Sequence, residues 1–308
     1  MSVQCFQQTA KQLLSAGIAN KTRQTYQNGL RLFKLFRTNF HLNDTWPVPI
    51  AHLIAFLSYL FESGYAPASA ASYLSAISFY HKINNLIDNT SNYRVDKTLE
   101  GFKRLRPTFD TRIPIMYETL LQIISTLSEI CSSKYEVCLF RAAYTMAFFG
   151  LFRVGELVAS SSEQADTALQ VDDVSVHNIK TSGSAAAKLS VRLKKSKTSQ
   201  YGASVRIPIC QVNGNACPVG AVIKYLNLRV ASSRFFFCHL NGKPLTRYQF
   251  GAVLTKCVNH LGLPSRGFRT HSFRIGAASW LAKKGVSDEV IKRMGRWKSQ
   301  AFKRYIRL

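Results

Sequence analysis

The spacing of apolar residues predicts helices through the first third of the chain. In residues 20–34, apolar side chains recur every three or four positions, as they do on one face of a helix, and basic side chains lie on another face. Residues 49–61 form a second, more apolar segment, and the glycine and proline within 64–67 would end it. Ser69 is placed to cap a third helix. The pattern therefore predicts a helical bundle over residues 1–105.

A stretch with two prolines and no periodicity follows, and we interpret residues 106–114 as a linker. Helical spacing then returns, with a strongly apolar segment at 141–152. Apolar and polar residues alternate at 169–176, again at 189–193 and at 205–209, which predicts three strands.

The last two of these strands would pair as a hairpin through a turn at 195–202, and the pattern is helical again after Pro218. The expected fold is therefore mainly α with a small antiparallel β-sheet. It would comprise an N-terminal helical bundle and a second domain over residues 115–308.

Charge adds a strong constraint on the binding partner. The chain has 41 Lys and Arg residues against 16 Asp and Glu, a net charge of +25, and is 46% hydrophobic. A foldable chain with such a surplus is expected to bind a polyanion, most often nucleic acid. Residues 266–308 contain twelve basic and two acidic residues. This one-sided surplus favours phosphate contacts over an ordinary solvated surface.

The sequence lacks the features that mark several other classes of protein. The longest apolar stretch contains Arg141 and is shorter than the roughly 20 residues that span a bilayer, and the N-terminus does not resemble a secretory signal. The seven cysteines are odd in number and form no CxxC pair, which favours reduced thiols over disulfides or zinc. No phosphate-binding loop is present. We therefore expect an intracellular protein without cofactor, metal, membrane or small-molecule substrate.

Several segments of the second domain contain residues suited to phosphate chemistry. Arg153 follows an apolar helix, where an unpaired buried guanidinium is costly, so it either pairs with Glu156 or points into a cleft. The expected hairpin turn contains Lys195 and Lys197. His271 lies three positions before an arginine, at a spacing that shares one helical face.

The C-terminal segment completes the set with Arg274, Trp297 and Tyr305, the last in an expected basic helix over 301–307. Taken singly, each of these features is more often structural: an ion-paired helix end, a surface helix, a core tryptophan. Their order along one domain is much harder to obtain by chance.

With these residues in this order, the chain resembles the tyrosine recombinases, the family of phage integrases, Cre and Xer. The resemblance covers residues 150–308 well, and the helical first half loosely resembles the family's core-binding domain. It implies a site-specific recombinase that cleaves and rejoins DNA through a 3′-phosphotyrosyl intermediate, without metal or ATP. Tyr305 would be the nucleophile, Arg153 and Arg274 would bind non-bridging oxygens, and His271 would accept or hold the tyrosine proton.

The resemblance also implies a proton donor for the leaving 5′-oxygen, with Lys197 the best match and Lys195 the second. Trp297 matches a position held by His or Trp, and would donate its indole N–H to a phosphate oxygen. The segment 295–307 looks most like recombinases of DIRS- and Crypton-type eukaryotic mobile elements.

Two features depart from the family pattern. Trp297 precedes Tyr305 by eight positions, one fewer than in many members, and the sequence ends three residues after Tyr305. The second departure puts in doubt assembly through a C-terminal helix.

The expected partners are double-stranded DNA and further copies of the chain, from dimer to tetramer, and a eukaryotic host would place the protein in the nucleus. A type IB topoisomerase and a catalytically silent, domesticated DNA-binding protein are the alternatives. The expected DNA-contacting residues are Lys21, Arg23, Arg31, Lys34, Lys195 and Arg296.

Overall fold

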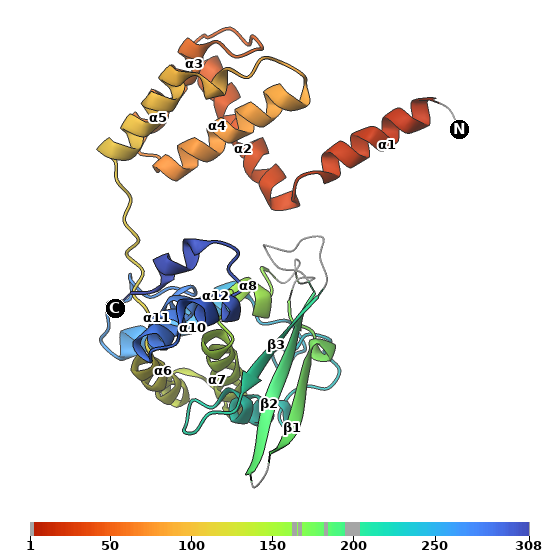
Figure 1. Ribbon diagram of the computed structural model, residues 1–308, viewed down its shortest axis with the longest axis vertical. Coiled ribbons are helices and arrows are strands. Elements are labelled where there is room, and N and C mark those ends of the chain that lie inside the picture. Colours follow the sequence, from red (N-terminus) through yellow and green to blue (C-terminus); the bar gives the residue numbers. More distant parts are fainter. Residues whose placement is uncertain (1–2, 162–164, 166–167, 182–183, 195–203, 308) are drawn as a thin grey trace. The chain divides into compact units, whose positions relative to one another are not determined.

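The computed structural model describes residues 3–161, 165, 168–181, 184–194 and 204–307. The chain forms two compact units, Met1–Asp110 and Thr111–Leu308 (Figure 1). The boundary lies inside the segment that the sequence suggests as a linker, 106–114. Ile113 and Ile115 already belong to the second unit, because their amides donate to the carbonyls of Gly267 and Ser272.

The first unit is helical, as expected. Phe33, Phe56, Leu60 and Ile77 are buried at its centre, with at most 1% of each side chain exposed. Its elements are α1 (Val3–Ala16), α2 (Asn20–Asn39), α3 (Ile50–Glu62), α4 (Pro67–Ile83), the 3₁₀ turn η1 (Asn89–Ser91) and α5 (Tyr93–Leu105).

The start of α4 corrects one expectation. Ser69 does not cap this helix, which begins two residues earlier at Pro67 with Ala66 at the N-cap position. Proline suits the first helical position because its fixed φ is already helical and its missing N–H would have no partner there. The expected segment at 49–61 agrees with α3 to within one residue at each end.

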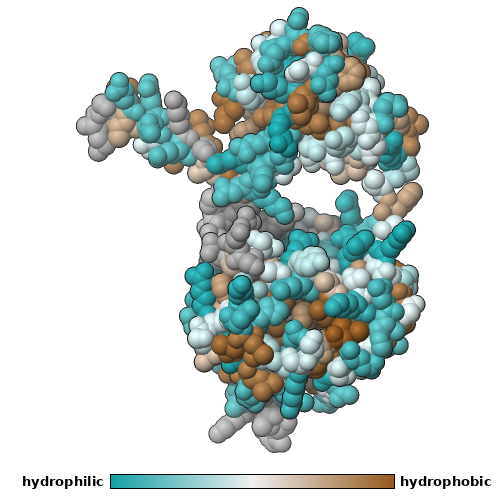
Figure 2. Space-filling view, turned by 180° about the vertical axis from the view of Figure 1, so that it is seen from behind, coloured by the Kyte–Doolittle hydropathy of each residue, from teal (hydrophilic) through white to brown (hydrophobic). Residues whose placement is uncertain are grey.

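The second unit combines helices with one small sheet. Its helices are α6 (Tyr117–Ile130), α7 (Lys134–Phe149), α8 (Val154–Leu157), α9 (Pro218–Leu226), α10 (Arg247–His260), α11 (Ser272–Lys283) and α12 (Asp288–Met294). It also contains the 3₁₀ segments η2 (Val171–Asp173) and η3 (Gln300–Tyr305) and the strands β1 (Val174–Thr181), β2 (Ser184–Leu193) and β3 (Val205–Cys210). Figure 1 shows the sheet along one side of this unit's helices. In Figure 2, hydrophilic residues cover much of one face of this unit, between smaller apolar patches.

The three strands form an antiparallel sheet in the order β1-β2-β3. The expected hairpin is confirmed, with Leu189 opposite Ile209 and Val191 opposite Ile207. The strand expected at 169–176 begins later, at Val174, because the preceding residues form η2. The connecting turn expected at 195–202 lies outside the described residues.

Helix α7 runs through the core of the second unit and ends four residues before Arg153. It was expected at 141–152 but spans Lys134–Phe149, and its first turn is capped by the Ser133 hydroxyl, which accepts from the Glu136 amide at 3.2 Å. At its end, a Cβ on Gly150 would lie 2.1 Å from the Phe152 ring. Glycine therefore allows the chain to turn sharply out of the helix.

Helix α11 packs closely against the segment that enters the second unit. A Cβ on Gly276 would lie 1.7 Å from the carbonyl oxygen of Ile115, so only glycine allows this approach. Among the described residues, no helix has both the length and the apolar character needed to cross a membrane.

Candidate active site

Tyr305 and His271 meet at the centre of the candidate site. Their side chains are joined by a hydrogen bond of 2.9 Å between the tyrosine hydroxyl and Nε2 of the imidazole. His271 is the N-cap residue of α11, directly before the helix in which it was expected, and Tyr305 ends η3, which is a 3₁₀ helix and not the expected α-helix. The order of the elements thus brings together two residues that are 34 positions apart.

Buried Ser279 anchors the chain around the tyrosine. Its hydroxyl lies 3.1 Å from the carbonyl oxygen of Tyr305 and accepts from the amide of Arg307 at 2.9 Å. Since α11 contains Ser279 and begins next to His271, one helix fixes both the backbone and the hydroxyl partner of the tyrosine.

Arg274 lies fully buried beside the tyrosine. It donates to the carbonyl oxygens of Leu151 and Gly295, and its guanidinium lies 4.2 Å from the centre of the Trp297 ring and 5.7 Å from that of Tyr305. Burial lowers the pKa of Arg274 to about 9, and two neighbouring arginines add to this effect. Nε of Arg274 has no hydrogen-bond partner in the described structure.

The sequence leaves open whether Arg153 pairs with Glu156 or points into a cleft, and in the structure it pairs with Glu156. Its Nη1 donates to Oε1 of the carboxylate at 2.9 Å, and its own amide donates to Oε2 at 2.9 Å. The side chain of Arg153 remains 23% exposed, against 6% for Glu156. The arginine is therefore oriented by a buried carboxylate while part of its side chain stays accessible.

The indole of Trp297 forms one wall of the site. Its ring centre lies 5.0 Å from that of Tyr305, and its buried Nε1 has no hydrogen-bond partner among the described residues. An indole nitrogen can only donate, so this buried N–H stays unsatisfied until an acceptor such as a ligand oxygen reaches it. Trp297 also explains the preceding glycine, since a Cβ on Gly295 would meet the indole ring at 1.5 Å.

Arg296 is placed differently from the DNA contact that the sequence suggests. Its guanidinium points into the unit and donates to Glu156 Oε2 at 2.9 Å and to the carbonyl oxygens of Gly150 and Leu151 at 3.0 and 3.2 Å. Only 13% of the side chain is exposed. These donors of Arg296 are thus engaged inside the protein.

A groove next to His271 contributes basic residues that the sequence reasoning missed. It has a volume of about 880 Å³, and its wall includes Arg112, Arg247, Tyr248 and Arg269. Arg247 and Tyr248 open α10 directly after its capping residue Thr246. A basic and an aromatic residue side by side in the first turn of a helix were the sequence signal that could have identified this groove.

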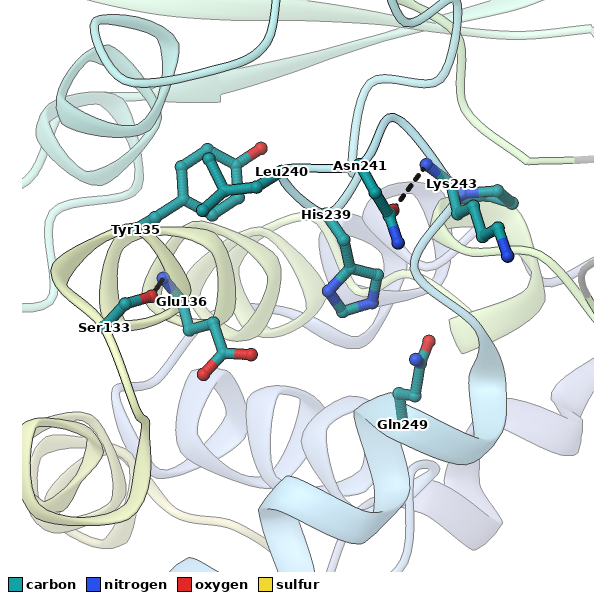
Figure 3. Close-up of a pocket in the computed structure, with 9 residues that line it drawn as sticks. Ser133, Tyr135, Glu136, His239, Leu240, Asn241, Lys243 and Gln249 are labelled. Carbon is teal, nitrogen blue, oxygen red and sulfur yellow. Dashed lines mark hydrogen bonds between the residues drawn. The ribbon is translucent and has the colours of Figure 1, made fainter.

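A second hollow in the same unit contains none of the expected site residues. Figure 3 shows His239 between Glu136 and Gln249 at this place, with Asn241 and Lys243 on the adjoining loop. We therefore assign the candidate chemistry to the groove with His271.

The remaining candidates belong to other parts of the sequence. Lys195 and Lys197 are outside the described residues. Lys194, directly before them, donates to Gln170 Oε1 at 2.7 Å. In the first unit, α2 presents three exposed basic side chains and one that is half-buried. The exposed residues are Lys21, Arg31 and Lys34, and the half-buried one is Arg23.

Comparison with known proteins gives matches over both units. Residues 116–308 match the model of the phage integrase family, and residues 10–84 match that of the phage integrase N-terminal SAM-like domain. A search of curated proteins gave no significant match.

Solved structures share the fold at low sequence identity. A lambda integrase dimer bound to a COC′ core site has a TM-score of 0.62 and 17% identity, over 99% of this chain and 77% of that one. The Tn1549 transposon integrase in complex with transposon right end DNA has a TM-score of 0.63 and 15% identity, over 97% of this chain and 93% of that one. The XerH site-specific recombinase bound to a palindromic difH substrate has a TM-score of 0.62 and 14% identity, over 92% of this chain and 76% of that one.

Proposed function

The chain belongs to the phage integrase family, and we propose that it is a site-specific DNA recombinase that cleaves and rejoins DNA through Tyr305. The hydrogen bond of 2.9 Å between Tyr305 and His271 supports this most directly, because it joins a nucleophile to a base beside the guanidinium of Arg274. The likeness to DIRS- and Crypton-type recombinases stays a prediction.

In the proposed reaction, the Tyr305 oxygen attacks a backbone phosphorus as its proton passes to Nε2 of His271. The new bond joins the tyrosine to the 3′-phosphate, and the bond from phosphorus to the 5′-oxygen breaks. A lysine from the sequence between β2 and β3 donates the proton to the leaving oxygen, with Lys197 the first choice and Lys195 the second. Rejoining is the reverse, with a 5′-hydroxyl attacking the phosphotyrosine, so the energy of the broken bond is retained.

Charge on the phosphate is neutralised by the arginines, since the transfer of a phosphoryl group requires mainly positioning and electrostatic stabilisation. Guanidinium groups suit non-bridging oxygens because their N–H donors form a planar fork. Arg153 retains exposed surface for this contact, and Arg274 has an unused Nε. The unpartnered indole N–H of Trp297 adds a third donor.

The expected partners are double-stranded DNA and further copies of the chain. The similar lambda integrase was solved as a dimer on its core site, and the Tn1549 and XerH structures also contain DNA. The groove with Arg112, Arg247 and Arg269 supplies positive charge beside His271. We place the protein wherever its DNA is, which is the nucleus in a eukaryotic host.

The first unit favours a recombinase over a type IB topoisomerase. Residues 10–84 match the SAM-like domain of phage integrases, which accompanies their catalytic domain. The contact between Tyr305 and His271 likewise favours an active enzyme over a silent DNA-binding protein.

A covalent-trapping experiment tests the proposal. The protein is incubated with nicked duplexes that carry the DNA flanking its coding region, and adducts that resist SDS are counted. We expect an adduct with the wild type and none with Tyr305→Phe. Tyr93→Phe is the matched control, since it removes the hydroxyl of a tyrosine that is 73% exposed and belongs to the first unit. Equal adduct from wild type and Tyr305→Phe would eliminate Tyr305 as the nucleophile.

A further inference from the structure

Arg296 lies between the two residues that hold Arg274. Gly295, directly before it, accepts a hydrogen bond from Arg274 through its carbonyl oxygen, and the ring of Trp297, directly after it, lies 4.2 Å from the Arg274 guanidinium. The backbone of Arg296 is left-handed, with φ of 58°. Few residues other than glycine adopt this conformation, which indicates that tertiary contacts hold Arg296 in place.

The side chain of Arg296 reaches the segment that carries the other arginine of the site. It binds Glu156 and the carbonyl oxygens of Gly150 and Leu151, and its guanidinium lies 5.1 Å from the centre of the Phe152 ring. These partners are between 140 and 146 positions away in the sequence. Arg296 therefore joins the turn before Arg153 to the segment around Arg274.

Glu156 is shared between two arginines. Its Oε1 accepts from the Arg153 side chain, and its Oε2 accepts from the Arg153 amide and from Arg296, each at 2.9 Å. Burial raises the pKa of Glu156, but the charges of Arg296 and Arg153 and the amide hydrogen bond outweigh burial and lower it overall. The carboxylate is consequently ionised at neutral pH and has a fixed orientation.

This sharing determines how much positive charge is left for a ligand. Two guanidinium groups bind one carboxylate, so Glu156 neutralises only part of the charge of Arg153. Without Arg296, the whole carboxylate would act on Arg153 and would weaken its attraction for a phosphate. The carbonyl oxygen of Gly150 would lose the Arg296 bond, and that of Leu151 would keep only Arg274.

We propose that Arg296 is a positioning residue for DNA cleavage, which holds Glu156 and the Gly150–Leu151 turn so that Arg153 and Arg274 are aligned on one phosphate. This inference rests on the proposed function and assigns Arg296 no contact with DNA. It also gives a role to the residue that precedes the unusually spaced Trp297.

The first measurement is the single-turnover rate of covalent adduct formation. We expect Arg296→Ala to lower it about a hundred-fold, the size of effect that a misplacement of about 1 Å can produce. Arg296→Lys keeps the charge but lacks the fork that serves a carboxylate and two carbonyls, so it should recover only part of the rate. Arg293→Ala, which removes an exposed arginine of α12, is the matched control and should cleave like the wild type.

A second substrate separates positioning from general loss of structure. In it, a neutral methyl group replaces one non-bridging oxygen at the cleaved phosphate. Since this substitution removes the charge that the arginines neutralise, the deficits of Arg296→Ala and Arg153→Ala should both shrink on it. A variant that is merely unfolded in part would lose the same factor on both substrates.

DNA affinity as a function of salt provides the third measurement. A positioning residue leaves the slope of log K against log salt unchanged, whereas loss of a direct phosphate contact lowers its magnitude by about 0.9. Wild-type cleavage by Arg296→Ala, an equal deficit on both substrates, or a reduced slope would each overturn the inference. If the alanine variant does not fold, Arg296→Lys decides by the same criteria. A wild type that forms no adduct overturns the proposed function itself, and this inference with it.

Discussion

Gly276→Ala tests how closely α11 packs on the segment that enters the second unit. The new Cβ would lie 1.7 Å from the carbonyl oxygen of Ile115 and 2.3 Å from its carbonyl carbon, and both atoms belong to the backbone. Moving them would break the hydrogen bond of 3.1 Å from the Ile115 amide to the Ser272 carbonyl oxygen, at the start of α11.

The expected cost is large for a single methyl group. Overpacking of a rigid site costs about 3 kcal/mol and the lost hydrogen bond about 1 kcal/mol. The higher helix propensity of alanine returns about 1 kcal/mol. The net loss in the free energy of unfolding is thus about 3 kcal/mol, which lowers the Tm of a domain of this size by roughly 6–12 °C.

Thermal unfolding followed by circular dichroism measures this change. Gly251→Ala is the matched control, because this glycine is also inside a helix of the second unit and its Cβ would meet only Thr270 Cγ2, at 3.4 Å. It should leave the Tm unchanged or raise it slightly. If Gly276→Ala unfolds at or above the wild-type temperature, the close packing of α11 on Ile115 is refuted.

Two further predictions concern one group in each unit. Burial raises the pKa of Asp88, but hydrogen bonds from Ser78 and Thr90 outweigh it and lower the pKa from 3.8 to about 2. Since the folded pKa lies below the unfolded one, Asp88 contributes about 2 kcal/mol above pH 4 and loses it as the pH falls toward 2. In acid titrations of unfolding, Asp88→Asn should lack this loss, and an unchanged titration would contradict the assignment. Ser279→Ala removes the hydroxyl that anchors the backbone around Tyr305, so adduct formation should fall about ten-fold, with a cost of about 1–3 kcal/mol in unfolding free energy. An unchanged cleavage rate would show that the hydroxyl is not needed to place the tyrosine.

Much of the fold is encoded in local patterns. The alternation that predicted the hairpin is confirmed because each strand buries one face, and the spacing within residues 20–34 is confirmed by the buried Phe33. The start of α7 was missed although Ser133 and Glu136 form a recognisable capping pair. The start of β1 was placed too early because a 3₁₀ turn can carry the same alternation as a strand.

The candidate site was predictable in its members and less so in its contacts. His271, Arg274 and Tyr305 follow from residue order, and the structure brings the three together. The role of Arg296 does not follow, because its partners precede it by 140 or more positions and only the folded chain brings them within reach. In a strongly basic segment, an arginine that faces inward has the same sequence signature as one that faces DNA.

The hydrogen bond between Tyr305 and His271 has a consequence for timing. The phenol, the imidazole and the Arg274 guanidinium come from one chain and already lie side by side before any substrate arrives. In the proposed reaction, the nucleophile of each chain is therefore in place without a separate delivery step. The moment of strand scission must then be set by how the scissile phosphate is brought to a waiting hydroxyl, so that control over the reaction rests with the geometry of the bound duplex.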